Sequence, residues 1–229
     1  MGEHYINDAI IKLMKDNGAD LVGFGDLSSI KDDELNIGVS IAVKVDKDII
    51  RGIHNGPNLE YYKEYTRINN LLDNLVLMGA EYLKSNGYKA YAQTRDVTLY
   101  GSDLLTKLPH KTVATRSGIG WIGKCAVLVT KEYGSAVRLS SFLTNAPLVY
   151  AKPIDHSSCG NCTSCRDYCP AKAVYGVNWS VSSKREELID PFACEKKADE
   201  LCLKSFGVKA TICGKCIEVC PFTQKYLIK

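Results

Sequence analysis

The sequence predicts a layered α+β fold, followed by a smaller domain organised by cysteines. Two observations support this prediction. Helical and strand patterns of apolar residues alternate over residues 1–150, which is typical of an α/β or α+β layer structure. After Pro147 the composition changes, because nine of the ten cysteines lie between Cys159 and Cys220. We therefore expect two domains, 1–150 and 151–229.

The elements of the first domain follow from the spacing of apolar residues and from the residues that end helices. Gly18 is expected to stop the first helix and Gly87 the long one, while Pro109 precedes a short helix. In chain order we expect a helix at 6–16, strands at 21–24 and 37–45, a long helix at about 59–85, a strand at 88–93, a short helix at 110–116, and strands at 126–129 and 136–143.

Composition and charge argue against several classes of function. The chain has 45% hydrophobic and 24% charged residues, as ordinary globular domains do, and no apolar run approaches the length of a membrane-spanning helix. Residues 1–20 form an amphipathic segment that contains acids, unlike a signal peptide. We therefore expect a cytoplasmic protein without a membrane partner. A net charge of +3 is too small to indicate a nucleic-acid-binding surface.

The first cysteine run, CGNCTSCRDYCP, has the spacing C-x2-C-x2-C-x3-C-P of bacterial ferredoxins. The two-residue gaps let Cys159, Cys162 and Cys165 face one cluster, whereas Cys169 serves a different cluster. Pro170 is expected to begin a helix that carries Cys169 away. Because there is no secretory signal, this spacing indicates metal binding rather than disulfides.

The second run, CGKCIEVCPF, repeats the C-x3-C-P ending but is one ligand short. In the crossed ferredoxin arrangement, the first 4Fe–4S cluster takes the first three cysteines of the first run together with Cys220. A zinc site with four thiolates is the alternative, but two interleaved runs of this kind favour iron–sulfur clusters. On spacing alone, the ligands of the second cluster are Cys169, Cys213, Cys216 and either Cys194 or Cys202.

The stretch SGIGWIGKC, residues 117–125, contains the G-x-G-x-x-G pattern of dinucleotide-binding loops. Such a loop follows a strand, begins a helix and has an acid about 20 residues further on. Here a short helix is expected before it, residues 126–129 predict a strand after it, and residues 138–144 contain no acid. The pattern therefore does not predict nicotinamide binding, and its glycines are expected to let the backbone approach a larger ligand. Cys125 is expected to be a buried apolar side chain.

The sequence resembles the epoxyqueuosine reductases and their shorter homologues, which are iron–sulfur proteins that use cobalamin. The resemblance extends over essentially the whole chain. It rests on the segment RSGIGWIGK at 116–124, on Gly134, on Leu143-Thr144, and on the cysteine framework with Asp190-x3-Cys194. The glycine–tryptophan segment joined to this cysteine order is what makes the resemblance specific.

The resemblance implies a nitroreductase-like first domain that binds a corrinoid, a cobalamin held without its lower base, as in reductive dehalogenases. A bacterial ferredoxin-like domain with two 4Fe–4S clusters would follow. The resemblance also implies that Cys194 completes the second cluster and that Cys202 is spare. The residues that we expect to bind the corrinoid are His110, Lys111, Arg116, Gly118, Gly120, Trp121, Gly123 and Lys124.

Two departures from the full-length family bear on the substrate. The chain ends at Lys229, shortly after Cys220, where full-length members continue into a helical-repeat domain that helps to hold tRNA. A tRNA partner is therefore doubtful. The family places a proton-donating aspartate shortly before the glycine–tryptophan segment, and no residue here is clearly in its register. Asp103 and His110 are the candidate catalytic residues, because either could transfer a proton.

These observations predict an oxidoreductase that passes electrons through two 4Fe–4S clusters to a bound cobalamin. The expected electron donor is a small protein such as a flavodoxin or ferredoxin, and the expected substrate is a small molecule or a modified nucleoside. One alternative is a non-enzymatic electron or corrinoid carrier that reduces cobalt for a partner protein. Another is a flavin-dependent reductase on the same fold. The size of the first domain argues against a bare carrier.

Overall fold

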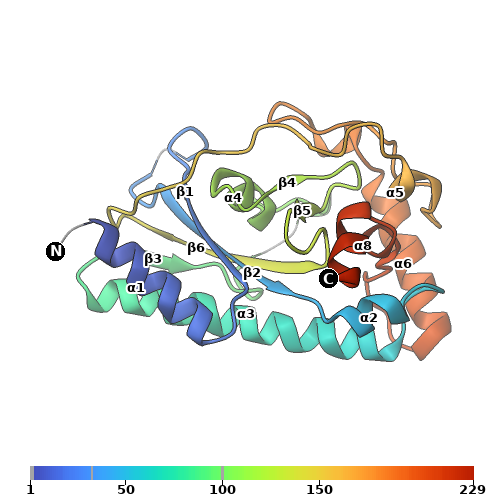
Figure 1. The fold of residues 1–229 in the computed structure, drawn as a ribbon, viewed down its shortest axis with the longest axis horizontal. Coiled ribbons are helices and arrows are strands. Elements are labelled where there is room, and N and C mark those ends of the chain that lie inside the picture. Colours follow the sequence, from blue (N-terminus) through green and yellow to red (C-terminus); the bar gives the residue numbers. More distant parts are fainter. Residues whose placement is uncertain (1–2, 32, 99–100) are drawn as a thin grey trace. The chain divides into compact units, whose positions relative to one another are not determined.

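The structure is a computed structural model that describes residues 3–31, 33–98 and 101–229 (Figure 1). It combines helices and strands, which confirms the predicted mixed fold. The elements are α1 (Glu3–Asp16), β1 (Leu21–Asp26), β2 (Ile37–Lys44), α2 (Lys47–Gly52), α3 (Leu59–Ser85), β3 (Ala90–Ala92), α4 (His110–Arg116), β4 (Gly120–Ile122), β5 (Leu128–Thr130), β6 (Val137–Thr144), α5 (Ser164–Asp167), the 3-10 helix η1 (Arg185–Glu187), α6 (Pro191–Phe206), α7 (Lys215–Glu218) and α8 (Pro221–Ile228).

The long helix α3 and the short helix α4 cover the predicted residues, 59–85 and 110–116. The helix predicted after Pro170 is absent: α5 precedes Cys169, and a turn follows in which the backbone N–H of Lys172 donates to the Cys169 carbonyl at 3.0 Å. Pro221, which follows Cys220 in the same way, does begin a helix. That helix buries Tyr226 and Leu227, whereas the segment after Pro170 soon meets Gly176 at a φ of 85°.

The chain packs as two compact units, each assembled from segments that are separated in the sequence. The first unit comprises Met1–Val43, Ile68–Gly120 and Arg138–Ile154. The second unit comprises Lys44–Arg67, Trp121–Val137 and Asp155–Lys229. All of the cysteines belong to the second unit. The predicted division into domains near residue 150 stays a prediction.

The first unit is built on a four-stranded sheet of order β1-β2-β6-β3, in which β1 pairs antiparallel with β2, and β3 with β6. Helices α1 and α3 cover one face of the sheet and α4 the other (Figure 1). On the α3 side, Gly79 lies so close to Phe142 of β6 that an added Cβ would be 2.6 Å from the ring. On the α4 side, an added Cβ on Gly38 of β2 would be 2.6 Å from the Val113 side chain. Side chains from alternate strand positions thus form a core on each face.

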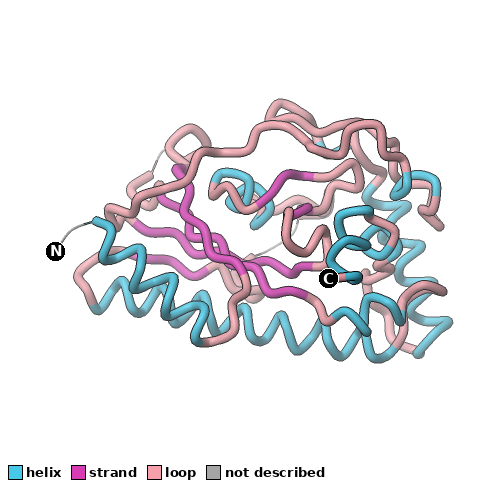
Figure 2. The backbone as a smooth tube through the Cα atoms, viewed as in Figure 1, coloured by secondary structure: helices cyan, strands magenta, loops and turns pink. Residues whose placement is uncertain are grey.

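The second unit contains helices, loops, β5 and most of β4, which pair as a two-stranded sheet, and Figure 2 shows that the chain between β6 and α6 is mostly loop. The C-terminal helix α8 is fixed by Tyr226, whose hydroxyl donates to the Val45 carbonyl at 3.0 Å. Helix α7 is held by Lys215, which donates to the His54 carbonyl at 2.9 Å and to the carboxylate of Glu218 on the same helix at 2.8 Å. Glu218 is 8% exposed. His54 Nδ1 lies 3.1 Å from the same carboxylate. Among the helices of the described residues, none has the length and apolar character needed to cross a bilayer.

Candidate functional site

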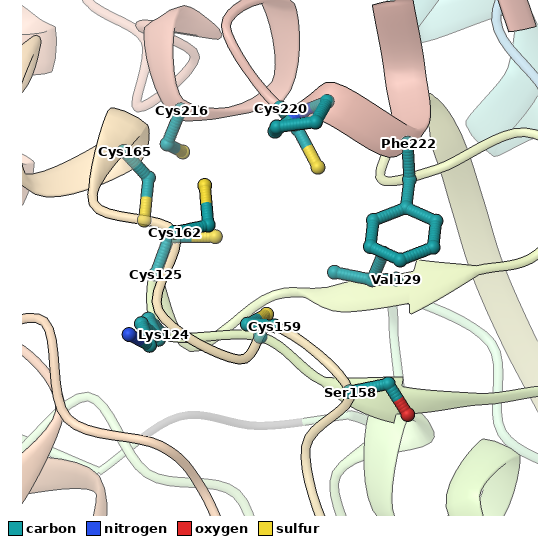
Figure 3. A pocket seen from close by; sticks show the side chains of 12 residues that line it. Lys124, Cys125, Val129, Ser158, Cys159, Cys162, Cys165, Cys216, Cys220 and Phe222 are labelled. Carbon is teal, nitrogen blue, oxygen red and sulfur yellow. The ribbon is translucent and has the colours of Figure 1, made fainter. Parts of the chain in front are cut away.

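Six cysteines of the second unit line one cavity of about 290 Å³. Three belong to the first run, two to the second run, and one to the segment that follows β4. Figure 3 shows their side chains around the cavity. We call this cavity the first cysteine pocket, and its cysteines are Cys125, Cys159, Cys162, Cys165, Cys216 and Cys220. The structure thus brings together the four cysteines that the spacing assigned to the first cluster.

Local structure presents the second-run cysteines to this pocket. Cys220 is the N-cap residue of α8, with extended backbone angles of −65° and 125°, and Pro221 occupies the first turn. Cys216 lies on α7, which begins after Gly214 in a left-handed conformation with a φ of 74°. An added Cβ on Gly214 would be 2.6 Å from Ile53. Only glycine combines this conformation with so close an approach, so Gly214 sets where α7 begins.

The second half of the glycine–tryptophan segment lies against the same pocket. The Trp121 indole N–H donates to the Cys159 sulfur at 3.4 Å, and the ring packs edge-on against Phe222 at 4.9 Å between centroids. Gly123 and Lys124 line the pocket. An added Cβ on Gly123 would be 2.8 Å from Val129, so the glycine is required here by close packing within the protein.

Burial and contact with neighbouring thiols oppose the ionisation of two pocket thiols, Cys125 and Cys165. The Cys125 thiol, together with burial, raises the pKa of Cys165 far above its usual range. Cys165 lowers the pKa of Cys125, but Cys216 and burial outweigh it and raise that pKa well above its usual value. Positive charge from bound iron would offset this penalty, because thiolates are the form that binds metal.

The size of the pocket indicates what the thiols can hold. Within the described ranges, no three His, Cys, Asp or Glu side chains are grouped so that they could bind one metal ion. Four thiolates on a single zinc ion lie roughly 4 Å apart, because each Zn–S bond is about 2.3 Å. A cluster with iron at each corner keeps its ligands further apart, and a cavity of about 290 Å³ can hold several atoms. The donor set and the volume of the cavity are compatible with an iron–sulfur cluster.

A second group of thiols consists of Cys169, Cys194 and Cys213, which interact electrostatically. Burial, followed by the nearby Cys169 and Cys213, raises the pKa of Cys194 to about 11. Burial also raises the pKa of Cys213, and the nearby Cys169 and Cys202 raise it further. Cys202 is fully buried. The structure thus places Cys194 near two other candidate ligands, Cys169 and Cys213, whereas Cys202 lies near Cys213.

Helix α6 determines where Cys194 lies. Asp190 caps this helix, because its carboxylate accepts from the backbone N–H groups of Phe192 and Ala193, each at 3.0 Å. Pro191 occupies the first helical turn. The cap holds Cys194 in the first turn of α6, where its backbone N–H donates to the Asp190 carbonyl at 3.2 Å.

In the first unit, His110 belongs to a chain of hydrogen bonds that joins three segments. Its Nδ1 lies 2.8 Å from the Ser141 hydroxyl, which donates to Gln93 Oε1 at 2.7 Å. Ser141 is fully buried and Gln93 is 9% exposed. Because the Ser141 hydrogen is used by Gln93, Ser141 accepts from a protonated Nδ1 of His110. The Nδ1 atom of the ring therefore carries a hydrogen.

Burial, with a smaller effect of Arg138, lowers the pKa of His110 to about 4, although Asp73 raises it. His110 is thus neutral at pH 7 in the folded protein. An unfolded chain takes up a proton on this histidine below its ordinary pKa of 6.5, whereas the folded protein does not until about 4.

This difference predicts that stability is lost as the pH falls from 6.5 toward 4. Between pH 7.5 and pH 5 the loss is about 2 kcal/mol. His110→Gln lacks this pH-dependent contribution. Between pH 7.5 and pH 5, the Tm of the wild type should therefore fall more than the Tm of the variant. Thermal unfolding of both proteins at the two pH values measures it. Parallel pH profiles would contradict a neutral His110 in the folded protein.

The other predicted site residues have different surroundings. Asp103 is exposed, and its carboxylate accepts from the backbone N–H of Leu105 at 3.0 Å. Arg116 is 8% exposed and donates to the Ile154 carbonyl at 3.0 Å, and Lys111 is partly buried on the same helix. Gly118 has a φ of 68°, and an added Cβ would be 3.0 Å from Ala151. Gly120, which is buried, begins β4. Corrinoid contacts of these residues stay a prediction.

One residue of the first cysteine pocket was missed by sequence reasoning. Cys125 is buried, at 6% exposure, as predicted, but its thiol lies among the other pocket thiols instead of in an apolar core. A single cysteine far from both runs carries no spacing signal. Only the fold brings it to the pocket.

No protein-family model matches this sequence. The epoxyqueuosine reductase of Lactococcus garvieae is 47% identical over 64 residues, which are 28% of this chain and 18% of that protein. The epoxyqueuosine reductase of Bacillus cereus is 35% identical over 118 residues, 50% of this chain and 30% of that protein. These matches thus cover less than a third of either relative.

The fold is similar to solved structures of two kinds. A selenomethionine-labelled epoxyqueuosine reductase matches with a TM-score of 0.63 at 22% identity, over 97% of this chain and 67% of that chain. The catabolic reductive dehalogenase NpRdhA, in complex with 3-bromo-4-hydroxybenzoic acid, matches with a TM-score of 0.71 at 17% identity, over 94% and 31%. A reductive dehalogenase described for B12-dependent dehalogenation matches with a TM-score of 0.70 at 18% identity, over 93% and 31%. The predicted resemblance is therefore confirmed: the chain is similar to epoxyqueuosine reductases in sequence over about half its length and in fold over nearly all of it.

Proposed function

We propose that this chain is an iron–sulfur reductase with two 4Fe–4S clusters, a ferredoxin-like part that holds them and a nitroreductase-like part that binds a corrinoid. The observation that carries the proposal is the first cysteine pocket. It joins three cysteines of the first run to Cys220 of the second run. Such crossing of runs is how bacterial two-cluster ferredoxins share their ligands, and the pocket has the thiol chemistry and the volume for one cluster.

The second cluster is assigned to Cys169, Cys194, Cys213 and Cys216. The electrostatic proximity of the first three supports this assignment. Cys216 also borders the first cysteine pocket, so the two clusters would be close neighbours within the second unit. Neighbouring clusters allow an electron to pass from one to the other, which is what a reductase supplied by an external donor requires.

The corrinoid part of the proposal is supported by the similarity in fold to reductive dehalogenases, one of which is described for B12-dependent chemistry. A bound corrinoid supplies a redox-active cobalt, while the protein positions it and excludes water. His110, Lys111 and Arg116 on α4 would bind its polar groups, and Trp121 would pack against it. Gly118, Gly120, Gly123 and Lys124 complete the proposed corrinoid set.

The substrate class follows from the relatives only in outline. Curated relatives are named epoxyqueuosine reductases, but the matches cover less than a third of the two described above. We therefore propose a small molecule or a modified nucleoside as substrate, without assigning tRNA as a partner.

Asp103 or His110 would transfer the proton. Because His110 is neutral at pH 7 in the folded protein, an imidazolium there is not the acid. A small flavodoxin or ferredoxin would deliver electrons.

Anaerobic purification followed by iron and sulfide determination tests the cluster assignment. About eight irons per chain are expected, and a fully loaded protein with clearly fewer would contradict two 4Fe–4S clusters. Titration with cobalamin, followed by the corrin absorption bands, tests the corrinoid assignment separately. Unchanged bands would contradict it, and a yellow preparation that contains flavin would favour a flavin-dependent reductase. Reduced clusters that reduce bound cobalamin but no substrate would favour a carrier.

A further inference from the structure

We propose that Cys125 is an additional iron ligand in reserve at the first cluster, able to take the place of Cys165. This inference rests on the proposed function, because it assumes that the first cysteine pocket holds a 4Fe–4S cluster. Cys125 is 6% exposed and lines that pocket. Its thiol is within hydrogen-bonding reach of Cys165 and of Cys216. Figure 3 shows its side chain among those that line the pocket.

The pocket contains more thiols than one cluster uses. A 4Fe–4S cluster takes four cysteines, and these are supplied by the first run and Cys220. Cys216 is assigned to the second cluster, which also needs four ligands. Cys125 is therefore the pocket thiol that has no place in either ligand set. A soft thiolate so close to a ligand sulfur can bind the same iron when that ligand leaves.

The backbone holds Cys125 firmly toward the pocket. The segment Gly123–Val127 forms a tight turn between β4 and β5, in which the Gly123 N–H donates to the Val127 carbonyl and the Ala126 N–H to the Gly123 carbonyl, both at 2.8 Å. Ala126 has a φ of 60°, which a non-glycine residue adopts only when its surroundings impose it. The backbone of Val127 also hydrogen-bonds the Cys125 thiol. The thiol is thus fixed in place before any cluster binds.

The choice of Cys165 follows from the contact between the two side chains, each of which is the hydrogen-bonding neighbour of the other. Cys162 provides a matched comparison. It belongs to the same run and the same pocket, but its sulfur is paired with the Ser164 hydroxyl at 3.5 Å. Replacement by Cys125 is therefore expected at the position of Cys165 and not at that of Cys162.

The test compares two pairs of variants, purified anaerobically as the full chain: Cys165→Ala with and without Cys125→Ala, and Cys162→Ala with and without Cys125→Ala. Iron and sulfide per chain are determined, and the electron paramagnetic resonance spectra of the reduced proteins are recorded. Cys165→Ala is expected to keep about eight irons and the spectrum of two four-iron clusters. Adding Cys125→Ala should reduce the content toward about four irons. Cys162→Ala should lose the first cluster whether or not Cys125 is present.

The second cluster serves as an internal control for folding, because about four irons retained in the double variants show that the second unit has formed. Equal iron loss in Cys165→Ala and in its double variant would overturn the inference, as would equal retention by Cys162→Ala and Cys165→Ala. An iron content of wild type well below about eight would instead overturn the proposed function. The two failures are therefore distinguishable.

Discussion

Replacing Cys194 with alanine is expected to halve the iron content, from about eight to about four irons per chain, whereas replacing Cys202 should leave it unchanged. The two cysteines lie on the same helix, α6. At a rise of about 1.5 Å per residue, they are roughly 12 Å apart along its axis, so they cannot serve the same ligand position. Cys194 interacts with Cys169 and Cys213, and burial and these neighbours raise its pKa to about 11.

Cys202→Ala is the matched control, because it removes a thiol from the same helix. Cys202 is fully buried, so its loss is expected to reduce stability by about 1 kcal/mol through poorer packing, without loss of iron. Iron and sulfide analysis of both anaerobically purified variants decides between them. Iron loss in Cys202→Ala with retention in Cys194→Ala would show that the second cluster uses Cys202 as its ligand.

Elements with a strong local signal could be predicted from the sequence. Helix α3 could be located because its apolar residues recur at helical spacing over many turns and Gly87 follows it. By contrast, β4 was not predicted, because its three residues are surrounded by glycines. The helix expected after Pro170 was wrong for a related reason. A proline permits a helix start, but the helix forms only where the following residues bury a face, as Tyr226 and Leu227 do in α8.

The same distinction between local and long-range signals applies to the candidate site. The cysteines of the two runs could be identified because their spacing is local and specific. Cys125 could not be assigned to the pocket, and the hydrogen bond from Trp121 to Cys159 could not be foreseen, because both depend on long-range packing. The same holds for the link from His110 through Ser141 to Gln93, which joins three separate segments. The neutral state of His110 depends on desolvation within the fold, which no local pattern encodes.

Gly134→Ala is expected to be among the most destabilising single substitutions in the second unit. Gly134 has a φ of 58°, and an added Cβ would be 2.2 Å from the backbone nitrogen of Thr223 and 2.5 Å from the carbonyl carbon of Phe222. These are backbone atoms of α8, so relief requires the helix to move. The positive φ and the displacement together are expected to lower the free energy of unfolding by about 4 kcal/mol and Tm by about 10 °C.

Gly207→Ala separates the two causes, because Gly207 has a comparable φ of 74° but nothing within 4 Å of an added Cβ. It should lower the free energy of unfolding by only about 1 kcal/mol. The difference in stability between the variants therefore reports the contact with α8.

That contact also affects the proposed first cluster. Cys220 is the N-cap residue of α8, so a displaced helix moves this ligand. Gly134→Ala is accordingly expected to lose iron from the first cluster, whereas Gly207→Ala keeps it. Equal Tm and equal iron content in the two variants would show that α8 can shift without loss of stability or iron. The position of Cys220 would then not depend on Gly134.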